Sequence, residues 1–252
     1  MLIPVALVVT TALSSGENVA AHVIPTSFTL DNVTAVFHET NLPRLFLNSV
    51  IVSLGSTVVV LLVSSLAAFG IAQYPFPGSR IVLLVLLSGI MLAPATLIVP
   101  LYDTIRSLGL LNSYLGLIGP YAAFGLPIGT LLFRNAFLAL PRELSEAAVV
   151  DGASPVAIYA RVFLPLTRPV IATVAILQLL LSWNDYLIAL LVMTASSMQT
   201  VQLAYITFST QFLTDYGKQF AVLALITVPV IVVFLIFQRE FIRGLTGGAV
   251  KE

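Results

Sequence analysis

Apolar residues occur in five long runs separated by polar connections. The runs contain no lysine or arginine, and Asp185 is their only acidic residue; they are Leu45–Ala72, Ile81–Leu101, Tyr114–Phe133, Val170–Met193 and Phe220–Phe237. A helix needs about 20 mostly apolar residues to cross a bilayer. Backbone polar groups must be satisfied inside the hydrocarbon, so runs of this kind predict helices rather than loops. The pattern therefore predicts five transmembrane helices.

A shorter apolar run, Met1–Leu13, opens the chain. It is too short to cross a bilayer unaided, and no basic residue precedes it as in a signal peptide. We therefore interpret it as a shortened first span. The expected fold is an all-α membrane protein, a bundle of about six transmembrane helices with a short first one, in a single domain over residues 1–252.

Composition supports the membrane interpretation. Hydrophobic residues make up 59% of the 252 and charged residues only 9%, whereas a soluble domain carries about 25% charged residues. The 11 basic and 11 acidic residues cancel, so no nucleic-acid partner is indicated. The chain has no cysteine, and its two histidines, His22 and His38, lack a metal-ligand spacing, so we expect neither a metal nor a cofactor.

The basic residues predict the orientation, because cytoplasmic loops are enriched in lysine and arginine. One set of alternate loops holds eight: Arg80, Arg134, Arg142, Arg161, Arg168, Arg239, Arg243 and Lys251. The other set holds three: Arg44, Arg106 and Lys218. This difference places the long connection Leu138–Arg168 and the C-terminal tail, residues 239–252, in the cytoplasm.

The connection Leu138–Arg168 is predicted to form two short helices. Pro141 suits the first turn of a helix and Glu143 suits its positive end. That helix is expected to end near Asp151, because Gly152 can take a positive φ.

Ser154 then caps a second helix. We expect this helix to run to Phe163 and to stop before Pro165. An ordinary amphipathic loop on the membrane surface is the alternative.

The residues of this connection carry a specific spacing. Glu146-Ala147-Ala148 is followed by three residues, Gly152, nine residues and Val162-Phe163-Leu164-Pro165. This resembles the EAA loop of bacterial ABC-importer permeases, with Val162 in place of isoleucine.

Other short motifs resemble carbohydrate-type permeases of the maltose type. They are Asn48-Ser49, Pro75-Phe76-Pro77-Gly78, Trp183-Asn184-Asp185-Tyr186 and the C-terminal run Gly244–Lys251. The N-terminus departs from the pattern, because family members have a fuller first span.

The resemblance implies a type I ABC-importer permease that carries a sugar across the inner membrane of a bacterium or archaeon. The implied partners are a second homologous permease, two ATPase subunits, an extracytoplasmic sugar-binding protein and the lipid bilayer.

The resemblance also implies roles for individual residues. Those of the EAA loop would couple the permease to its ATPase: Glu146, Ala147, Ala148, Asp151, Gly152, Leu164 and Pro165. Those of the tail would contact the ATPase subunits: Gly244, Leu245, Thr246, Gly247 and Lys251.

Asp185 lies within a predicted span, where translocon scales assign a charged residue a cost of about 2.5–3.5 kcal/mol. It should therefore face protein or water. With Trp183, Asn184 and Tyr186 it could line a sugar pathway, or it could hold neighbouring helices together. The two interpretations carry equal weight.

A secondary transporter and a membrane enzyme are the two alternative classes of function. A stand-alone secondary transporter would show internal repeats and several intramembrane charges, and a membrane enzyme would show clustered catalytic residues. Neither pattern occurs. The sequence G-x-x-x-x-G-K-[ST] is absent, so the chain is not expected to bind ATP in that way. The hypothesis is a transport subunit rather than an enzyme.

Overall fold

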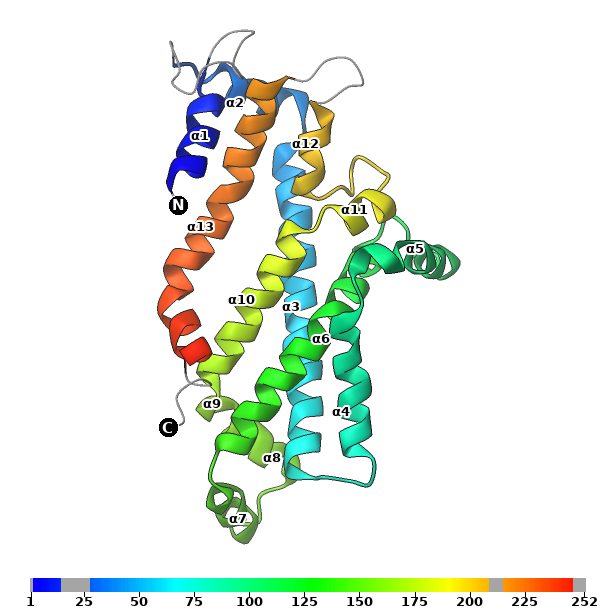
Figure 1. The fold of residues 1–252 in the computed structure, drawn as a ribbon, viewed down its shortest axis with the longest axis vertical. Helices are drawn as coiled ribbons and strands as arrows, with labels where there is room; N and C mark the ends of the chain where they lie inside the picture. The colour runs from blue at the N-terminus through cyan, green and yellow to red at the C-terminus, as the bar shows by residue number, and fades with distance from the viewer. Residues whose placement is uncertain (1, 15–27, 209–214, 247–252) are drawn as a thin grey trace. The chain divides into compact units, whose positions relative to one another are not determined.

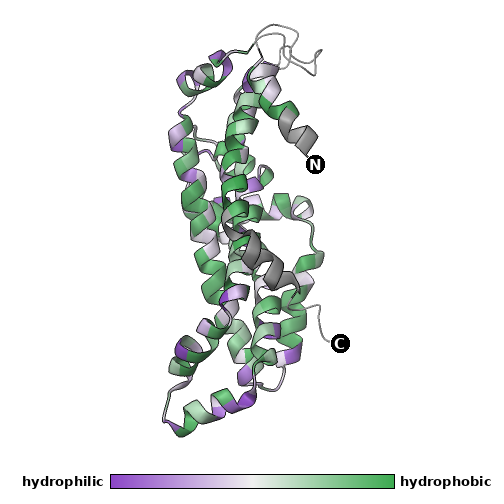
Figure 2. Ribbon diagram, turned by 90° about the vertical axis from the view of Figure 1, so that its left-hand side faces the viewer, coloured by the Kyte–Doolittle hydropathy of each residue, from purple (hydrophilic) through white to green (hydrophobic). Residues whose placement is uncertain are grey.

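The computed structural model describes residues 2–14, 28–208 and 215–246, with side chains described for residues 7–14, 28–208 and 215–235. Helices dominate these segments (Figure 1), whose only β structure is an isolated bridge between Ser14 and Phe28. The expected all-α class is confirmed. The long helices are apolar over most of their length, and hydrophilic residues gather toward helix ends and connections (Figure 2).

Three predicted spans are single helices. They are α3 (Leu42–Gln73), α6 (Tyr114–Ala139) and α13 (Tyr216–Thr246). Each contains a window long and apolar enough to cross a membrane, which for α13 lies within Tyr216–Leu235. The predicted boundaries were too short, because polar residues at helix ends carry no apolar signal. For α13 the helix continues nine residues beyond the predicted Phe237.

The predicted span Ile81–Leu101 is not one straight helix. It consists of α4 (Ser79–Ser88), η2 (Gly89–Met91), η3 (Pro94–Leu97) and α5 (Ile98–Ser107), with a 95° bend between the two halves. Leu92 and Ala93 are extended at the break. A residue before proline is disfavoured in the helical region, so Pro94 accounts for the interruption.

The predicted span Val170–Met193 is also interrupted. It consists of α10 (Arg168–Asn184) and α11 (Leu187–Val192), separated by Asp185 and Tyr186. Two bent helix pairs, Ser79–Met91 with Pro94–Ser107 and Pro155–Leu166 with Arg168–Asn184, could each form one span. Counted in this way, the described residues provide up to five spans. The expected short first span corresponds to α1 (Leu2–Ala12), whose 11 residues are too few to cross a bilayer.

The chain divides into two compact units, each built from several segments. Unit 1 comprises Met1–Val52, Ile105–Leu117 and Trp183–Leu235, and unit 2 comprises Ser53–Thr104, Ile118–Ser182 and Ile236–Glu252.

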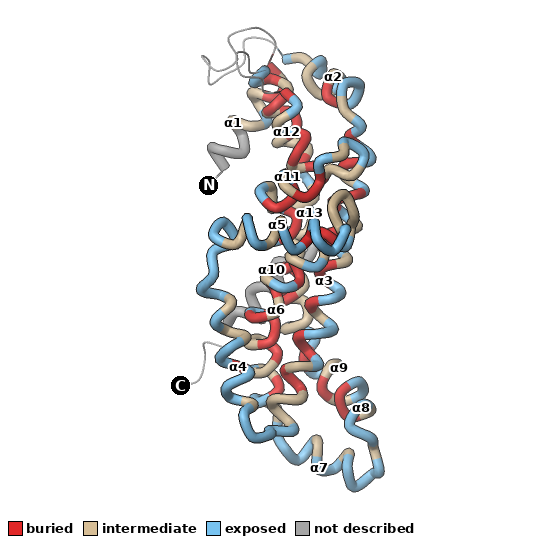
Figure 3. The backbone as a smooth tube through the Cα atoms, turned by 90° about the vertical axis from the view of Figure 1, so that its right-hand side faces the viewer, coloured by how far each residue is buried: buried red, intermediate tan, exposed pale blue. Residues whose placement is uncertain are grey.

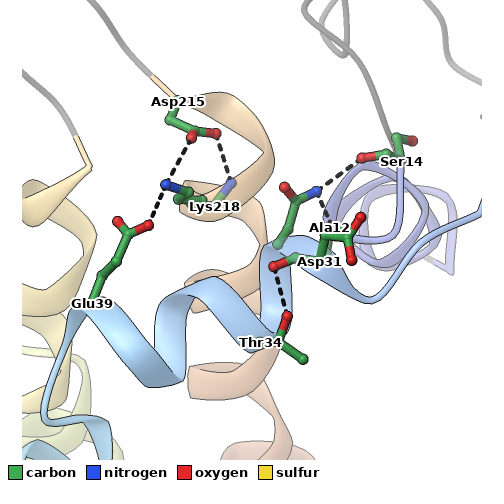
Figure 4. Close-up of polar contacts among 8 residues, drawn as sticks. Ala12, Ser14, Asp31, Thr34, Glu39, Asp215 and Lys218 are labelled. Atoms are coloured by element: carbon green, nitrogen blue, oxygen red, sulfur yellow. Dashed lines mark hydrogen bonds and ion pairs between the residues drawn. The ribbon is translucent and has the colours of Figure 1, made fainter.

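Unit 1 contains α1, α2 (Asp31–Glu39), η5 (Val201–Leu203), α12 (Ala204–Thr207) and the membrane window of α13. Its apolar core includes Leu42, Trp183, Val222 and Ile226. Hydrogen bonds connect α1 and α2 at the start of the chain (Figure 4). The Asn32 amide donates to the carbonyls of Ala12 and Ser14, at 3.1 and 2.9 Å, and so joins α2 to the end of α1.

Unit 2 is built around an aromatic cluster. Phe69 of α3 lies 5.2–6.1 Å, centroid to centroid, from the rings of Phe137, Tyr159 and Phe163. Edge-to-face pairs of this kind stabilise by about 0.5–1.5 kcal/mol each beyond their buried area. Phe133 stacks on Phe137 at 5.8 Å. The cluster joins α3 and α6 to the connection that precedes α10.

Helix α3 exposes apolar side chains and buries hydroxyls. Five of its exposed apolar residues follow a four-residue spacing: Val50, Leu54, Val58, Leu62 and Leu66. Its buried polar residues are Asn48, Ser49, Ser53, Ser56, Thr57, Ser64 and Ser65. Several of these hydroxyls donate to carbonyls of the preceding turn, for example Thr57 to Ser53 at 2.7 Å. This distribution suits a helix whose solvent is hydrocarbon, because each buried hydroxyl needs a partner within the protein.

Candidate functional site

The EAA loop contains a short exposed helix, α7 (Arg142–Val150). Pro141 precedes it with extended backbone, and Glu143 lies in its first turn, where a carboxylate interacts favourably with the helix dipole. Figure 3 shows α7 exposed along most of its length. Glu146 and Ala147 are exposed, whereas Ala148 packs against the core of unit 2. The two alanines therefore face different surroundings.

Gly152 ends α7 as predicted, with φ of +75°. The N–H of Ala153 donates to the carbonyl of Ala148 at 2.9 Å, and the N–H of Gly152 donates to that of Val149 at 3.0 Å. These two bonds form a Schellman motif, which requires a left-handed residue at this position. The side chain of the C-cap residue Asp151 is exposed. The angle between the two helical segments is therefore set by backbone geometry.

The second segment begins as expected and ends later. The hydroxyl of Ser154 accepts from the N–H of Ala157 at 3.3 Å, as an N-cap of α8 (Pro155–Ile158). Helical backbone then continues through a π-helical turn, η4 (Tyr159–Phe163), and α9 (Leu164–Leu166).

The prediction of a stop before Pro165 was wrong. Proline is tolerated in the first turn of a helix, and Pro165 is the second residue of α9. The chain turns instead at Thr167, where the two helical runs meet at 80°. Leu164 packs against the core of unit 2, and Pro165 is exposed.

The π-helical turn anchors the EAA loop in unit 2. Tyr159 and Phe163 are buried against Phe69. The hydroxyl oxygen of Tyr159 lies 2.7 Å from that of Ser65. A buried segment held by aromatic packing and a hydrogen bond moves with the helices that hold it.

A cavity of about 370 Å³ lies on this unit at the end of α3. Its walls include Gln73 and Tyr74 from α3 and its end, and Glu146, Val149 and Val150 from α7. Val149 and Val150 are 60% and 87% exposed. Sequence reasoning did not select these valines, although two apolar residues on a short cytoplasmic helix were a usable signal.

The four residues of the predicted polar patch in span five do not share one environment. Trp183 is buried in the core of unit 1, where its indole N–H donates to the carbonyl of Ile226 at 3.3 Å. Its ring lies 5.9 Å from that of Phe46. Asn184 is exposed, and Tyr186 is half-buried. Trp183 therefore packs as a core residue that joins the end of α10 to α13.

Asp185 caps a helix. Its Oδ2 accepts from the backbone N–H groups of Ile188 and Ala189, at 3.1 and 3.2 Å, at the start of α11. Sequence reasoning placed this carboxylate inside a continuous span. The helix break supplies two N–H donors, which are among the groups that a helix start leaves unpaired.

The tail residues lie at the limit of the described chain. Gly244, Leu245 and Thr246 belong to the last turn of α13, of which only the backbone is described. Gly247 and Lys251 lie outside the described residues. Within the described residues, no group of three or more His, Cys, Asp or Glu side chains could hold a metal ion.

Comparison with known proteins identifies the family. Residues 33–247 match the model of the binding-protein-dependent transport system inner membrane component. The chain belongs to this family. The match includes the EAA loop and the interrupted span five.

Individual relatives cover nearly the whole permease. The probable ABC transporter permease protein YurM of Bacillus subtilis is 34% identical over 98% of this chain and 83% of its own length. The trehalose transport system permease protein SugB of Mycobacterium tuberculosis is 35% identical over 99% and 92%. The arabinooligosaccharides transport system permease protein AraQ of Halalkalibacterium halodurans is 37% identical over 90% and 81%.

A solved structure shares the fold of the permease. It is a bacterial ABC transporter involved in the import of the acidic polysaccharide alginate, and the likeness has a TM-score of 0.82 over 95% of this chain and 90% of that one. The sequence identity is 22%, so the comparison supports the fold alone. The permease thus has the expected ABC-importer permease fold.

Proposed function

We propose that this permease imports a sugar across the inner membrane, driven by ATP hydrolysis in separate subunits that dock on α7. The observation that carries the proposal is the family match over residues 33–247, together with relatives whose names specify trehalose, α-glucosides and arabinooligosaccharides. The partners would be a second homologous permease, two ATPase subunits and an extracytoplasmic sugar-binding protein. A stand-alone secondary transporter is not favoured by these relatives.

Docking on α7 is supported by three features of unit 2. Glu146, Ala147 and the exposed valines present a surface with no cover among the described residues. The Gly152 turn fixes that surface relative to the next segment. The aromatic cluster then connects the segment to α3 and α6. A displacement of α7 would therefore be transmitted to α3 and α6, whereas a flexible loop would absorb it.

The orientation follows from the proposal and the basic residues. The EAA loop and the C-terminus would be cytoplasmic, and the start of α3 with the polar segment 194–219 would be extracytoplasmic. The tail would lie against the ATPase subunits through Gly244–Thr246, Gly247 and Lys251. Of the span-five residues, Asn184 and Tyr186 would be the ones open to a sugar pathway, because Trp183 is buried and Asp185 caps a helix.

The test is uptake by the complete transporter. Proteoliposomes containing both permeases, the ATPase subunits and the binding protein would be offered labelled trehalose, maltose, arabinotriose and diacetylchitobiose. ATP-dependent uptake of at least one of them is expected. Uptake that proceeds without ATP and follows an ion gradient would replace this proposal with the secondary-transporter alternative.

A further inference from the structure

A polar pocket of about 320 Å³ lies in unit 1, between the α2–α3 connection and the segment before η5. Small-molecule sites commonly have volumes of about 300–1,000 Å³. One wall consists of Glu39, Thr40, Asn41 and Arg44, and the other includes Ser196, Ser197 and Gln199. The site residues of the EAA loop and span five contribute nothing to it.

The second wall is held in place by side chains of α3. The amide of Asn48 donates to the carbonyls of Ser197 and Gln199, at 3.1 and 2.8 Å. The hydroxyl of Tyr114 in turn donates to Oδ1 of Asn48 at 2.8 Å. Asn48 is buried, so this side of the pocket is shaped before any ligand arrives.

Three further hydrogen bonds hold the segment that forms this wall. Nε of Arg44 donates to the carbonyl of Ser197 at 2.8 Å. The N–H of Ala195 donates to Oδ1 of Asn112 at 2.7 Å, and the N–H of Val201 donates to the hydroxyl of Ser49 at 2.8 Å. A loop that is already ordered by these hydrogen bonds loses little conformational entropy when a ligand binds.

The lining offers hydrogen-bonding groups to a ligand. Nε is the only guanidinium nitrogen of Arg44 bonded to another described residue. Toward the described residues Glu39 uses only Oε1, in an ion pair of 2.6 Å with Lys218 (Figure 4). The exposed hydroxyls of Ser196 and Ser197 add groups that can donate and accept. Donors and acceptors thus face the same space.

The charges of the described residues around the pocket cancel. Glu39 pairs with Lys218, which also lies 3.5 Å from Asp215, and Arg44 supplies the second positive charge. Two cations and two carboxylates favour a neutral ligand over an ion. Mixed donors and acceptors around a neutral space are suited to vicinal hydroxyl groups, which both donate and accept.

We propose that this pocket is an entry subsite for one ring of a neutral sugar, held by hydrogen bonds to Arg44, Glu39 and the serine hydroxyls. The proposal rests on the proposed function, which places the start of α3 outside the membrane. None of the described residues that line the pocket is aromatic, so they offer no ring stacking. The affinity is therefore expected to be weak, as suits a position that the sugar passes on its way inward.

Cysteine protection tests the pocket directly, because the natural chain has no cysteine. Ser197→Cys places a thiol in the lining, and Thr34→Cys places one on the exposed part of α2 outside it. The intact transporter, without its binding protein, would be labelled with a water-soluble maleimide. The sugar added is whichever one the uptake panel identifies, with sorbitol at equal concentration as the control.

Slower labelling of Ser197→Cys in the sugar, with Thr34→Cys unchanged, is the expected result. With a Kd of about 5 mM, about 50 mM sugar would slow labelling roughly tenfold. An unchanged rate at Ser197→Cys would overturn the proposal. Protection that needs the binding protein and ignores the sugar would also overturn it, since the pocket would then be a protein contact. Failure of every sugar in the uptake panel would instead overturn the proposed function itself.

Uptake kinetics give a second measurement if Ser197→Cys assembles poorly. Glu39→Gln alters a pocket wall and breaks the ion pair, whereas Lys218→Gln breaks the same ion pair from outside the lining. The proposal expects a higher KM for sugar uptake in Glu39→Gln than in Lys218→Gln, with similar ATPase activity. Equal KM values in the two variants would assign Glu39 a purely structural part and contradict the proposal.

Discussion

The hydroxyl oxygens of Ser65 and Tyr159 lie 2.7 Å apart in the buried core of unit 2. Ser65 belongs to α3 and Tyr159 to the π-helical turn of the EAA loop. The contact therefore joins the segment that follows α7 to a long membrane helix. In the proposed function, it is a polar contact through which movement of the loop would reach α3.

Tyr159→Phe is expected to weaken this connection without dismantling the cluster. It removes one hydrogen bond, typically worth about 0.5–1.5 kcal/mol, and Ser65 keeps its bond to the carbonyl of Leu61. Thermal unfolding should shift slightly downward. The number of sugars imported per ATP hydrolysed should fall.

Tyr159→Ala provides the comparison for that variant. Loss of the whole ring would leave a cavity beside Phe69 and Phe163 and should cost about 3–5 kcal/mol, by analogy with other aromatic truncations. Low yield of assembled permease is expected. If Tyr159→Ala assembles and transports as well as Tyr159→Phe, the cluster does not anchor the loop.

The close packing of α6 gives a second prediction. A Cβ added at Gly125 would overlap the amide oxygen of Gln178, and it would lie 3.0 Å from a methyl of Val60. Gln178 is buried and donates to the carbonyl of Tyr121 at 3.1 Å. Gly125→Ala should therefore lower the thermal midpoint, because overpacking costs about 1–3 kcal/mol.

Gly119→Ala is the matched control, since its Cβ would meet nothing within 4 Å. The double variant Gly125→Ala with Gln178→Ala should recover part of the loss, and a thermodynamic cycle over the four proteins measures the coupling. Strictly additive effects would show that the amide and the glycine do not interact.

The capping role of Asp185 yields a third prediction. Asp185→Asn retains an oxygen for the N–H groups of Ile188 and Ala189, whereas Asp185→Ala removes it. Loss of an N-cap costs about 0.5–2 kcal/mol. We expect sugar uptake per assembled transporter to be preserved in Asp185→Asn, and a lower thermal midpoint in Asp185→Ala. A strong loss of uptake in Asp185→Asn at normal assembly would favour the sugar-pathway interpretation.

Most of the fold could be predicted from the sequence, because a membrane helix carries a long apolar signal. The breaks within the predicted helices could not be predicted in this way. Hydropathy does not distinguish Leu92 and Ala93 from their neighbours, and the 95° bend there depends on the backbone restriction imposed by Pro94. The end of α13 was also missed, since the polar residues Gln238, Arg239 and Glu240 carry no apolar signal and yet continue the helix.

The sequence predicted the local features of the candidate site, such as its helix ends. It did not predict the contacts between residues far apart in the chain. Gly152 and Ser154 act within a few residues of themselves, so spacing alone indicated their roles. Tyr159 and Ser65 are 94 positions apart, and no local pattern pairs them. Asp185 was taken as an intramembrane charge because the helix break that gives it two donors depends on tertiary packing.

The orientation gives a fourth prediction. The excess of arginine in one set of loops places Ser145 and the C-terminus in the cytoplasm. Alkaline phosphatase fused after either position should be inactive, and a fusion within the segment 194–200 should be active. Phosphatase activity at Ser145 or at Glu252 would reverse the assignment and would place α7 on the wrong side for an ATPase.

The last prediction concerns the surface and angle of α7. Glu146→Lys reverses an exposed charge and should weaken ATPase attachment. Gly152→Val forces a β-branched residue to a φ of +75°, at a cost of about 1–3 kcal/mol. A Cβ there meets no atom within 4 Å, so the effect comes from the backbone. Gly152→Asn is the matched control, because asparagine tolerates this conformation.

The most direct test of coupling is the ratio of sugar imported to ATP hydrolysed in proteoliposomes containing the Gly152→Val transporter. We expect the permease to insert normally and this ratio to fall severalfold, while Gly152→Asn stays near the wild-type value. Loss of the ATPase subunits from Gly152→Val on purification would also support docking of these subunits on α7. A wild-type ratio in Gly152→Val, with the ATPase subunits still attached, would contradict it and leave α7 as an ordinary surface helix.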